Sequence, residues 1–304
     1  MTIRPLDLLD LPSLYRYRGE AVSLDSARLL TRGNPLGAVG MLAYMNPRRH
    51  VYTAVSDDGA TLLGGITHTN GDTFAKLLYL APASNLDLPS APALIDHLSA
   101  QAGSWGAFHA LAEVDEGSDA FPALRMSGFS VYAWQRMWDV SNIMASTNGS
   151  SWMRVKSVSL AAIQNLYHQI VPPLLQPVEP TPKSATGFMC NEGPKCFINL
   201  SMGAMGIVLY PLIHPEATDV GEKLAALVNS LPNRRSRPVY LCVRSYQAWL
   251  EPVLEDLGAK VATRQAVMVK HLARMLKDDQ VERVAQPAGV TVQPSRVSHM
   301  RPKK

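Results

Sequence analysis

The stretch YPLIHPEATDVGEKLAALVNSL, residues 210–231, decides the fold class of this 304-residue chain. An apolar run from Ile207 to Ile213 predicts a buried strand, and a short polar loop follows it. Apolar side chains then recur with the period of a helix, at Leu224, Leu227, Val228 and Leu231. The first N–H groups of a helix have no partner within it, and the helix dipole is positive there. The sequence therefore predicts a seat for an anion, such as a pyrophosphate, where the loop meets the helix.

The same stretch resembles the acyl-CoA-binding motif of the GNAT N-acetyltransferase superfamily. In that family a strand ends in a proline-containing turn, and a loop of the pattern Arg/Gln-x-x-Gly-x-Gly/Ala wraps the CoA pyrophosphate with backbone amides. Residues 213–215 resemble the turn, and Gly221 falls on the first motif glycine. Thr218 stands where Arg or Gln is expected, and Lys223 replaces the second small residue. The resemblance implies acetyl-CoA as a co-substrate, bound by Ile213, Thr218, Val220, Gly221, Glu222 and Lys223.

The first half of the chain predicts the order of elements found in GNAT proteins. Residues 50–69 give the clearest β signal, because Asp57-Asp58-Gly59 separates two apolar runs and glycine accepts the positive φ of a hairpin turn. Gly128-Phe129 resembles the helix ending that marks the closing segment of the family. The other expected elements are strands at 3–5, 74–80, 107–114 and 131–140, and helices at 10–18, 90–102 and 119–126.

The second half of the chain repeats the first. Five residues recur at an offset of 130: Leu111, Pro122, Leu124, Gly128 and Gln135 match Leu241, Pro252, Leu254, Gly258 and Gln265. We therefore expect two tandem GNAT-like domains, an α/β (α+β) fold in which each domain has a mixed, mostly antiparallel sheet flanked by helices. The expected bounds are 1–140 and 152–276, with a polar linker at 141–151 and a basic tail at 277–304 for which disorder is expected.

Composition and charge exclude several classes of protein. The chain has no run of about 18 apolar residues, so we expect no membrane partner. It has three cysteines and no Cys-x-x-Cys pair, which predicts reduced thiols in a cytoplasmic protein and no metal site. Residues 151–304 carry 19 Lys and Arg against 11 Asp and Glu, which suits an anionic partner such as CoA. Nucleic acid is disfavoured, because neither a recognition helix nor interleaved aromatic and basic residues are present.

The resemblance implies an acyl-CoA-dependent N-acyltransferase that transfers an acetyl group to an unknown amine. In that family the strand before the loop splays from its neighbour and offers backbone donors to the thioester and the pantetheine. The second copy is the expected active one, because the first has Asn85, Leu88 and Ser90 at the three signature positions. The alternative is a catalytically inactive GNAT-fold module that senses CoA or binds a protein.

The residues that perform the chemistry stay open at this stage. A tyrosine on the helix before Gly-Phe protonates the leaving thiolate in much of the family, and Leu124 and Leu254 stand at its positions here. His214 and Glu216 could act as a base, although an exposed polar pair in a loop is the commoner explanation. The Pro-rich segment 171–195 lies where the family often places acceptor-side elements, so it is a candidate cover for a site.

Overall fold

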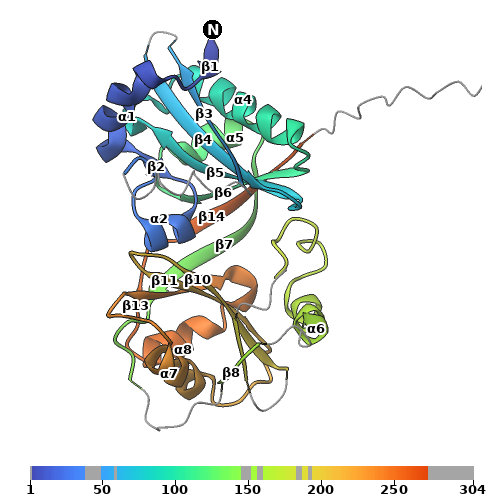
Figure 1. The fold of residues 1–304 in the computed structure, drawn as a ribbon. Coiled ribbons are helices and arrows are strands. Elements are labelled where there is room, and N and C mark those ends of the chain that lie inside the picture. The colour runs from blue at the N-terminus through green and yellow to red at the C-terminus, as the bar shows by residue number, and fades with distance from the viewer. Residues whose placement is uncertain are drawn as a thin grey trace, which may run out of the picture. The chain divides into compact units, whose positions relative to one another are not determined.

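The computed structural model describes residues 2–37, 49–57, 60–144, 152–155, 160–182, 187–190 and 194–272 (Figure 1). Strands of the first copy are β1 (Ile3–Pro5), β2 (Val22–Ser23), β3 (Arg49–Ser56), β4 (Leu62–Thr69), β5 (Phe74–Ala81), β6 (His109–Asp115) and β7 (Ser130–Asp139). Those of the second copy are β8 (Trp152–Arg154), β9 (Gly187–Cys190), β10 (Cys196–Met202), β11 (Ile207–Ile213), β12 (Val239–Arg244), β13 (Lys260–Val261) and β14 (Gln265–His271).

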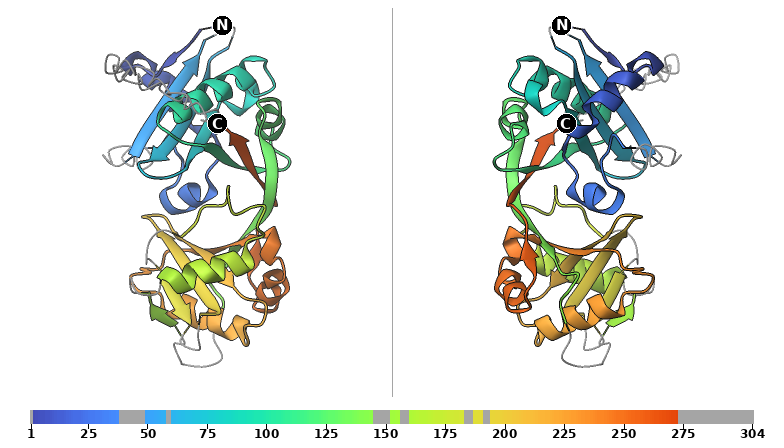
Figure 2. Two further views of the ribbon diagram at one scale, coloured as in Figure 1. Left: turned by 90° about the vertical axis from the view of Figure 1, so that its right-hand side faces the viewer. Right: turned by 90° about the vertical axis from the view of Figure 1, so that its left-hand side faces the viewer.

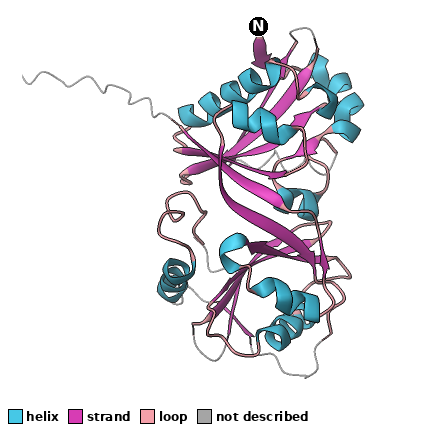
Figure 3. Ribbon diagram, turned by 180° about the vertical axis from the view of Figure 1, so that it is seen from behind, coloured by secondary structure: helices cyan, strands magenta, loops and turns pink. Residues whose placement is uncertain are grey.

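Helices cover the strands of both copies. The first copy has α1 (Leu11–Tyr17), α2 (Ser26–Arg32), α4 (Ser90–Ser104) and α5 (Ala120–Met126). The second has α6 (Leu160–Ile170), α7 (Val220–Ser230) and α8 (Leu250–Asp256), of which α7 and α8 pack side by side (Figure 3). Short 3-10 helices are η1 (Leu8–Asp10), η2 (Arg18–Glu20), η4 (Ala83–Asn85) and η6 (Ser245–Gln247). The predicted fold class is confirmed: helices flank a mixed, mostly antiparallel sheet in each copy.

Three sequence predictions fall largely outside the described residues. Strands β3 and β4 pair antiparallel as the hairpin prediction requires, but its turn residues 58–59 are not among those described. The same holds for residues 145–151 of the expected linker and for the whole of the expected tail. The domain bounds of 1–140 and 152–276 therefore stay a prediction.

The two copies share one continuous sheet, which the sequence did not predict. Its strand order is β1-β3-β4-β5-β6-β14-β7-β12-β11-β10-β9-β8, so β14 lies between β6 and β7, and β7 lies between β14 and β12. The two exchanged strands run antiparallel beside each other, β7 in green and β14 in red (Figure 2). The last strand of each copy is thus inserted between the last two long strands of the other.

The β7–β14 pair forms the centre of an approximate two-fold symmetry. Gln135 lies opposite Gln265 in the ladder, and these residues are also equivalent in the 130-residue repeat. Equivalent residues that face each other must lie on the axis that relates the copies. One axis therefore relates both the sequence repeat and the strand exchange.

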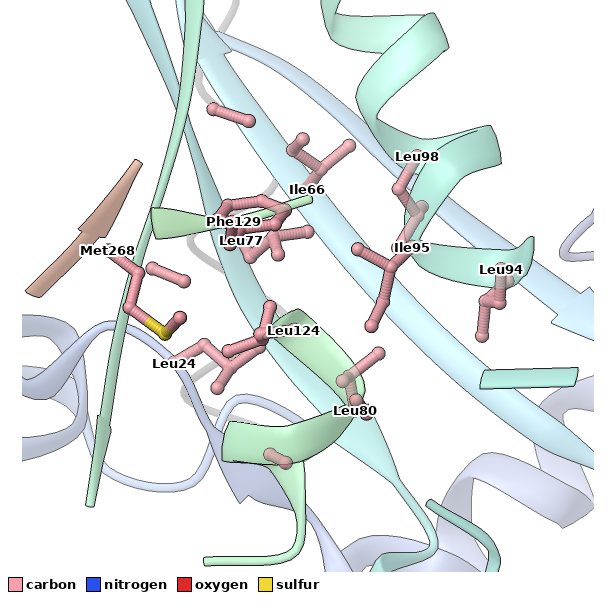
Figure 4. Close-up of a cluster of buried hydrophobic side chains, with 14 of the residues drawn as sticks. Leu24, Ile66, Leu77, Leu80, Leu94, Ile95, Leu98, Leu124, Phe129 and Met268 are labelled. Atoms are coloured by element: carbon pink, nitrogen blue, oxygen red, sulfur yellow. The ribbon is translucent and has the colours of Figure 1, made fainter. Parts of the chain in front are cut away.

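The exchange places a side chain from each copy in the core of the other. Met268 of β14 packs with Leu77, Leu124 and Phe129 of the first copy and is fully buried (Figure 4). Trp138 of β7 packs in the core of the second copy, beneath α7 and α8, and is 1% exposed. These two residues are again 130 apart, so the two cores are closed in the same way.

Met268 provides a test of this shared core. Met268→Ala should lower the free energy of unfolding by about 2–5 kcal/mol, because truncating a buried methionine leaves a cavity. Hydrogen exchange should then accelerate in β5 and β6, although both belong to the other copy. Met126→Ala is the control, since Met126 is 63% exposed on α5 and its truncation should cost less than about 0.5 kcal/mol. Unchanged exchange in β5 and β6 would show that β14 does not complete the first core.

Candidate functional site

Each copy contains a notch where two parallel strands part. Strands β5 and β6 stay paired only as far as Lys76 and Leu111, and the gap beyond this pair is called the first notch. Strands β11 and β12 stay paired as far as Leu209 and Leu241, and the gap beyond them is the second notch. Backbone groups at the edges of such a gap lack a strand partner and need another one. What occupies each notch therefore decides whether a ligand can bind there.

The first notch is filled by the protein's own backbone. The Leu24 N–H donates to the Leu78 carbonyl on β5 at 2.9 Å, and the Glu113 N–H on β6 donates to the Leu24 carbonyl at 2.9 Å. Strand β2 extends this contact by pairing with β5, with Val22 opposite Leu80. The segment 22–24 thus bridges both edges of the gap, and a ligand would have to displace main chain to enter.

The second notch is filled by a single side chain, that of Gln247 in η6. Its amide nitrogen donates to the Pro211 carbonyl at 2.8 Å, and its oxygen accepts from the Ile213 N–H at 3.0 Å. These are the two hydrogen bonds that a neighbouring strand or a ligand amide would make with β11. Ile213, a predicted cofactor-binding residue, therefore has its N–H engaged by Gln247, which is 1% exposed.

The loop before α7 leads into a helix start whose first amides have no partner in the described part of the chain. Within the described residues, the N–H groups of Val220, Gly221 and Glu222 form no hydrogen bond. Asp219 precedes them with φ of 52°, in the left-handed region, and turns the chain into the helix. Thr218 and Glu222 are exposed to solvent beside these amides. The first turn of α7 can therefore donate hydrogen bonds to an oxyanion.

The other two motif residues make contacts within the protein. Lys223 is 7% exposed, and its Nζ donates to the Thr218 carbonyl at 2.9 Å, so the lysine fixes the loop to the helix. Gly221 faces α8: a Cβ there would lie 3.3 Å from Cγ1 of Val253, closer than side chains normally approach. The glycine thus lets the two helices pack tightly.

In the equivalent loop of the first copy, four amides already have partners. The N–H groups of Asn85, Leu86, Leu88 and Ala91 all donate to carbonyls of residues 82–88 within the loop. An anion there would compete with four existing hydrogen bonds. The loop and the notch are thus both more fully bonded to main chain in the first copy than in the second.

The central cavity, about 340 Å³, is lined by residues of both copies. Tyr210 and Cys242 line it, and each is the first residue beyond the last pair of β11 and β12. Glu179, Pro180 and Pro182 line it too, so the described part of the Pro-rich segment does border a site. Its charged lining comprises five basic residues, Arg28, Arg32, Arg49, Lys76 and Arg244, and four acidic ones, Asp25, Asp72, Glu113 and Glu179.

Two glycines allow α2 of the first copy to border this cavity. A Cβ at Gly206 would lie 2.6 Å from the Leu30 carbonyl oxygen, and one at Gly203 would overlap the Thr31 carbonyl. The Met205 N–H donates to that Thr31 carbonyl at 2.9 Å and fixes the contact. The turn between β10 and β11 therefore holds the C-terminal end of α2, which carries Arg28 and Arg32, against the second copy.

Part of the cavity wall is a buried cluster of paired charges. Glu113 accepts from the Ser26 N–H at 3.0 Å and lies 3.9 Å from Arg244, whose Nε donates to Glu179 at 3.2 Å. Burial pushes the pKa of Glu113 upward, but the charges of Lys76 and Arg244 and the Ser26 amide outweigh it and hold that pKa below its usual value. Glu113 is therefore ionised at neutral pH.

The two glutamines on the symmetry axis join this cluster to the exchanged strands. Gln135 Oε1 accepts from Arg244 at 2.5 Å, and Gln135 Nε2 donates to Gln265 Oε1 at 2.9 Å. Gln265 Oε1 also accepts from the Ser26 hydroxyl at 2.8 Å. The arginine therefore contacts a carboxylate and an axial amide at once, which ties the cavity wall to the β7–β14 pair.

The titratable groups at the second notch keep their protons at neutral pH. Burial raises the pKa of the Cys242 thiol to about 12, so Cys242 is not a thiolate nucleophile. Burial also raises the pKa of Tyr210 well above its usual value, and the nearby Glu113 carboxylate adds to this. Tyr210 is therefore a neutral phenol at neutral pH.

Other candidates from the sequence lie elsewhere. His214 and Glu216 sit in the loop before α7, where the Glu216 N–H donates to His214 Nδ1 at 3.3 Å, and neither lines the central cavity. All three cysteines are buried and free. Among the described residues, no group of His, Cys, Asp and Glu could hold a metal ion, and no helix is long and apolar enough to cross a membrane.

Sequence reasoning missed the central cavity and its buried charges. Lys76 and Glu113 each interrupt an otherwise apolar strand, which is a signal for a buried polar cluster. Neither residue identifies its partner, because Arg244 reaches Glu113 only through the strand exchange. The repeat of Gln135 and Gln265 was visible, but not that the two residues touch.

The Glu113 cluster gives a prediction for stability against pH. Glu113→Gln should lower the free energy of unfolding on the order of 3 kcal/mol at neutral pH, because Lys76 and Arg244 lose a buried counter-charge. The folded-state pKa of Glu113 is lowered, so its contribution is complete above about pH 4.3, the pKa of an unfolded Glu, and is lost as pH falls through the folded pKa.

Urea unfolding of both proteins between acidic and neutral pH measures this difference. Glu116→Gln is the matched control, because Glu116 pairs with Arg264 on the surface and its loss should cost no more than about 1 kcal/mol. A deficit for Glu113→Gln that stays constant down to the lowest pH would contradict the ionised assignment.

Comparison with known proteins identifies the fold. No family model and no curated protein matches the sequence. A GCN5-related N-acetyltransferase from Sphaerobacter thermophilus matches the structure with a TM-score of 0.56 at 13% identity, over 89% of this chain and 95% of that one. A tandem GNAT protein from the clavulanic acid biosynthesis pathway matches with a TM-score of 0.50 at 13% identity, over 89% and 98%. The chain therefore has the tandem GNAT fold that the sequence predicted.

Proposed function

We propose that this protein is an acyl-CoA-dependent N-acyltransferase, transferring an acetyl group to an amine, with its active site in the second copy. The observation that carries the proposal is the asymmetry between the copies. Within the described residues, three amides at the start of α7 have no partner, and the side chain of Gln247 occupies the second notch. In the first copy four loop amides and both edges of the notch are hydrogen-bonded to main chain. The three free thiols favour the cytoplasm as its location.

The proposed site assigns a part of the substrate to each element. The α7 amides of Val220, Gly221 and Glu222 would bind the diphosphate of acetyl-CoA, with Lys223 and Thr218 holding the loop in shape. The pantetheine would lie along β11 in place of the Gln247 amide, using the Pro211 carbonyl and the Ile213 N–H. The thioester would then reach the central cavity beside Tyr210, and the amine would approach from the cavity.

Charge changes beside the α7 amides test where acetyl-CoA binds. Glu222→Gln should tighten binding and Thr218→Glu should weaken it, each about twofold to fivefold, because both side chains are exposed next to the helix start. Isothermal titration of the full chain with acetyl-CoA measures the affinity, and release of the CoA thiol with a panel of primary amines measures turnover.

Asp87→Asn in the first copy's loop is the matched control, since Asp87 is exposed and its substitution also removes one negative charge. It should leave the affinity unchanged. Two results oppose the proposal: the absence of any acetyl-CoA binding, or an effect of Asp87→Asn equal to that of Glu222→Gln, which would move the site to the first copy.

Gln247 favours a second candidate, a GNAT-fold binding module without catalysis. A fully buried glutamine that satisfies both backbone groups of β11 completes the strand as a structural element would. On this alternative the notch is permanently closed, and the protein acts through its other surfaces. The two candidates differ in whether removing the Gln247 side chain makes β11 available to acetyl-CoA.

Gln247→Ala separates these candidates. The variant should lose about 1–3 kcal/mol of stability in either case, because the Pro211 carbonyl and the Ile213 N–H lose a buried partner. If acetyl-CoA docks on β11, the same variant should bind it more tightly than the wild type by calorimetry. Gln164→Ala, an exposed glutamine on α6, should change neither quantity. Lost stability with no gain in affinity supports the non-catalytic module.

A further inference from the structure

Three arginines gather at one part of the central cavity. Arg28 and Arg32 lie one helical turn apart on α2, and Arg49 opens β3; all three line the cavity. Like charges four residues apart on a helix repel each other, and a third guanidinium adds to this repulsion. Burial and then the charges of Arg49 and Arg28 lower the pKa of Arg32, while Asp25 opposes them only in part. The local potential at Arg32 is therefore positive.

Three of the acidic residues that line the cavity are engaged by other groups. Asp25 lies 3.7 Å from Lys76 and caps α2 by accepting from the Arg28 N–H at 3.2 Å. Glu113 and Glu179 are engaged by Arg244 and Lys76 in the buried cluster. Among the described residues, the guanidinium groups of Arg32 and Arg49 form neither a hydrogen bond nor an ion pair.

The arginine group and the second notch belong to different parts of the cavity. The charges that act on Arg32 are Arg49, Arg28 and Asp25, whereas Tyr210 at the notch is influenced by Glu113, Asp25 and Arg244. The three arginines, Asp25 and Tyr210 all line the same cavity. A ligand held at the arginines can therefore extend toward the notch.

We propose that the central cavity binds a small molecule bearing an oxyanion group, a carboxylate or a phosphate, through Arg32 and Arg49 with Arg28 beside them. Guanidinium groups match the geometry of both oxyanions and bind them through paired, charge-assisted hydrogen bonds. Their mutual repulsion is relieved when the anion is bound, so the free protein holds them ready at a cost in stability. That this ligand is the acyl acceptor rests on the proposed function; that the cavity binds an oxyanion does not.

The proposal can be tested without any acyl-CoA, whose own phosphates would confuse the result. Thermal unfolding of the full chain is followed in increasing inorganic phosphate or succinate, with ionic strength held constant by chloride. The midpoint should rise with at least one of the two anions, and the effective anion identifies the group that is recognised. The concentration dependence gives a dissociation constant for that anion.

Variants then locate the binding. Arg32→Gln and Arg49→Gln should each lower the affinity for the anion about tenfold to hundredfold, which is the loss expected for a charge-assisted contact. In chloride alone, Arg32→Gln should unfold at a higher temperature than the wild type, because one repelling charge is gone. Arg125→Gln, an exposed arginine on α5 remote from the cavity lining, is the matched control and should respond to the anion as the wild type does.

The outcomes separate this inference from the proposed function. No response of the wild type to either anion, or an equal response of Arg32→Gln and Arg125→Gln, overturns the anion site. A site that responds as expected in a protein without acyl transfer leaves the inference standing and removes only the assignment of the ligand as acceptor. If the anion site and acyl transfer are both present, Arg32→Gln should raise the KM for an anionic amine and leave the affinity for acetyl-CoA unchanged.

Discussion

The pairing of β7 with β14 is the constraint on which the rest of the structure depends. Each strand crosses into the other copy, so the backbone ladder is continuous from one copy to the next. Met268 and Trp138 lie in the opposite cores because each belongs to one of the two exchanged strands. The same pairing sets Gln135 against Gln265 and brings Arg244 within reach of Glu113. Without the exchange, the central cavity would lose its charged wall.

The repeat could be predicted from the sequence, and the exchange could not. Matching residues 130 positions apart, such as Leu124 and Leu254, report that two segments bury the same faces in the same order. A strand buries those faces whichever copy it joins, because its ladder hydrogen bonds come from the backbone and are nearly blind to side chains. The elements and the fold class were therefore predictable, and the identity of the neighbouring strand was not.

The two notches likewise show how far a binding site can be predicted from the sequence. The motif around Gly221 predicts an anion-binding loop, and the amides of residues 220–222 have no partner among the described residues. Nothing in the pattern of Val22–Leu24 indicates that this segment fills the first notch, since it does so with main-chain N–H and carbonyl groups. The burial of Gln247 in the second notch could not be predicted either, because a buried glutamine and an exposed one look alike in a single sequence. A sequence motif can thus predict a binding loop while the access to it is set by distant segments.

The charged residues of the central cavity fall into two groups, one in which the charges are paired and one in which like charges repel. Burying a charge is tolerable when partners surround it, as Lys76, Glu113 and Arg244 surround one another. Such a cluster fixes how the two copies meet but does not require a ligand. Arg32 and Arg49 repel each other, and within the described part of the chain neither guanidinium is ion-paired with a carboxylate. A fold departs from local optimality mainly where function requires it, so the arginines are a stronger indication of a ligand than the larger buried cluster beside them.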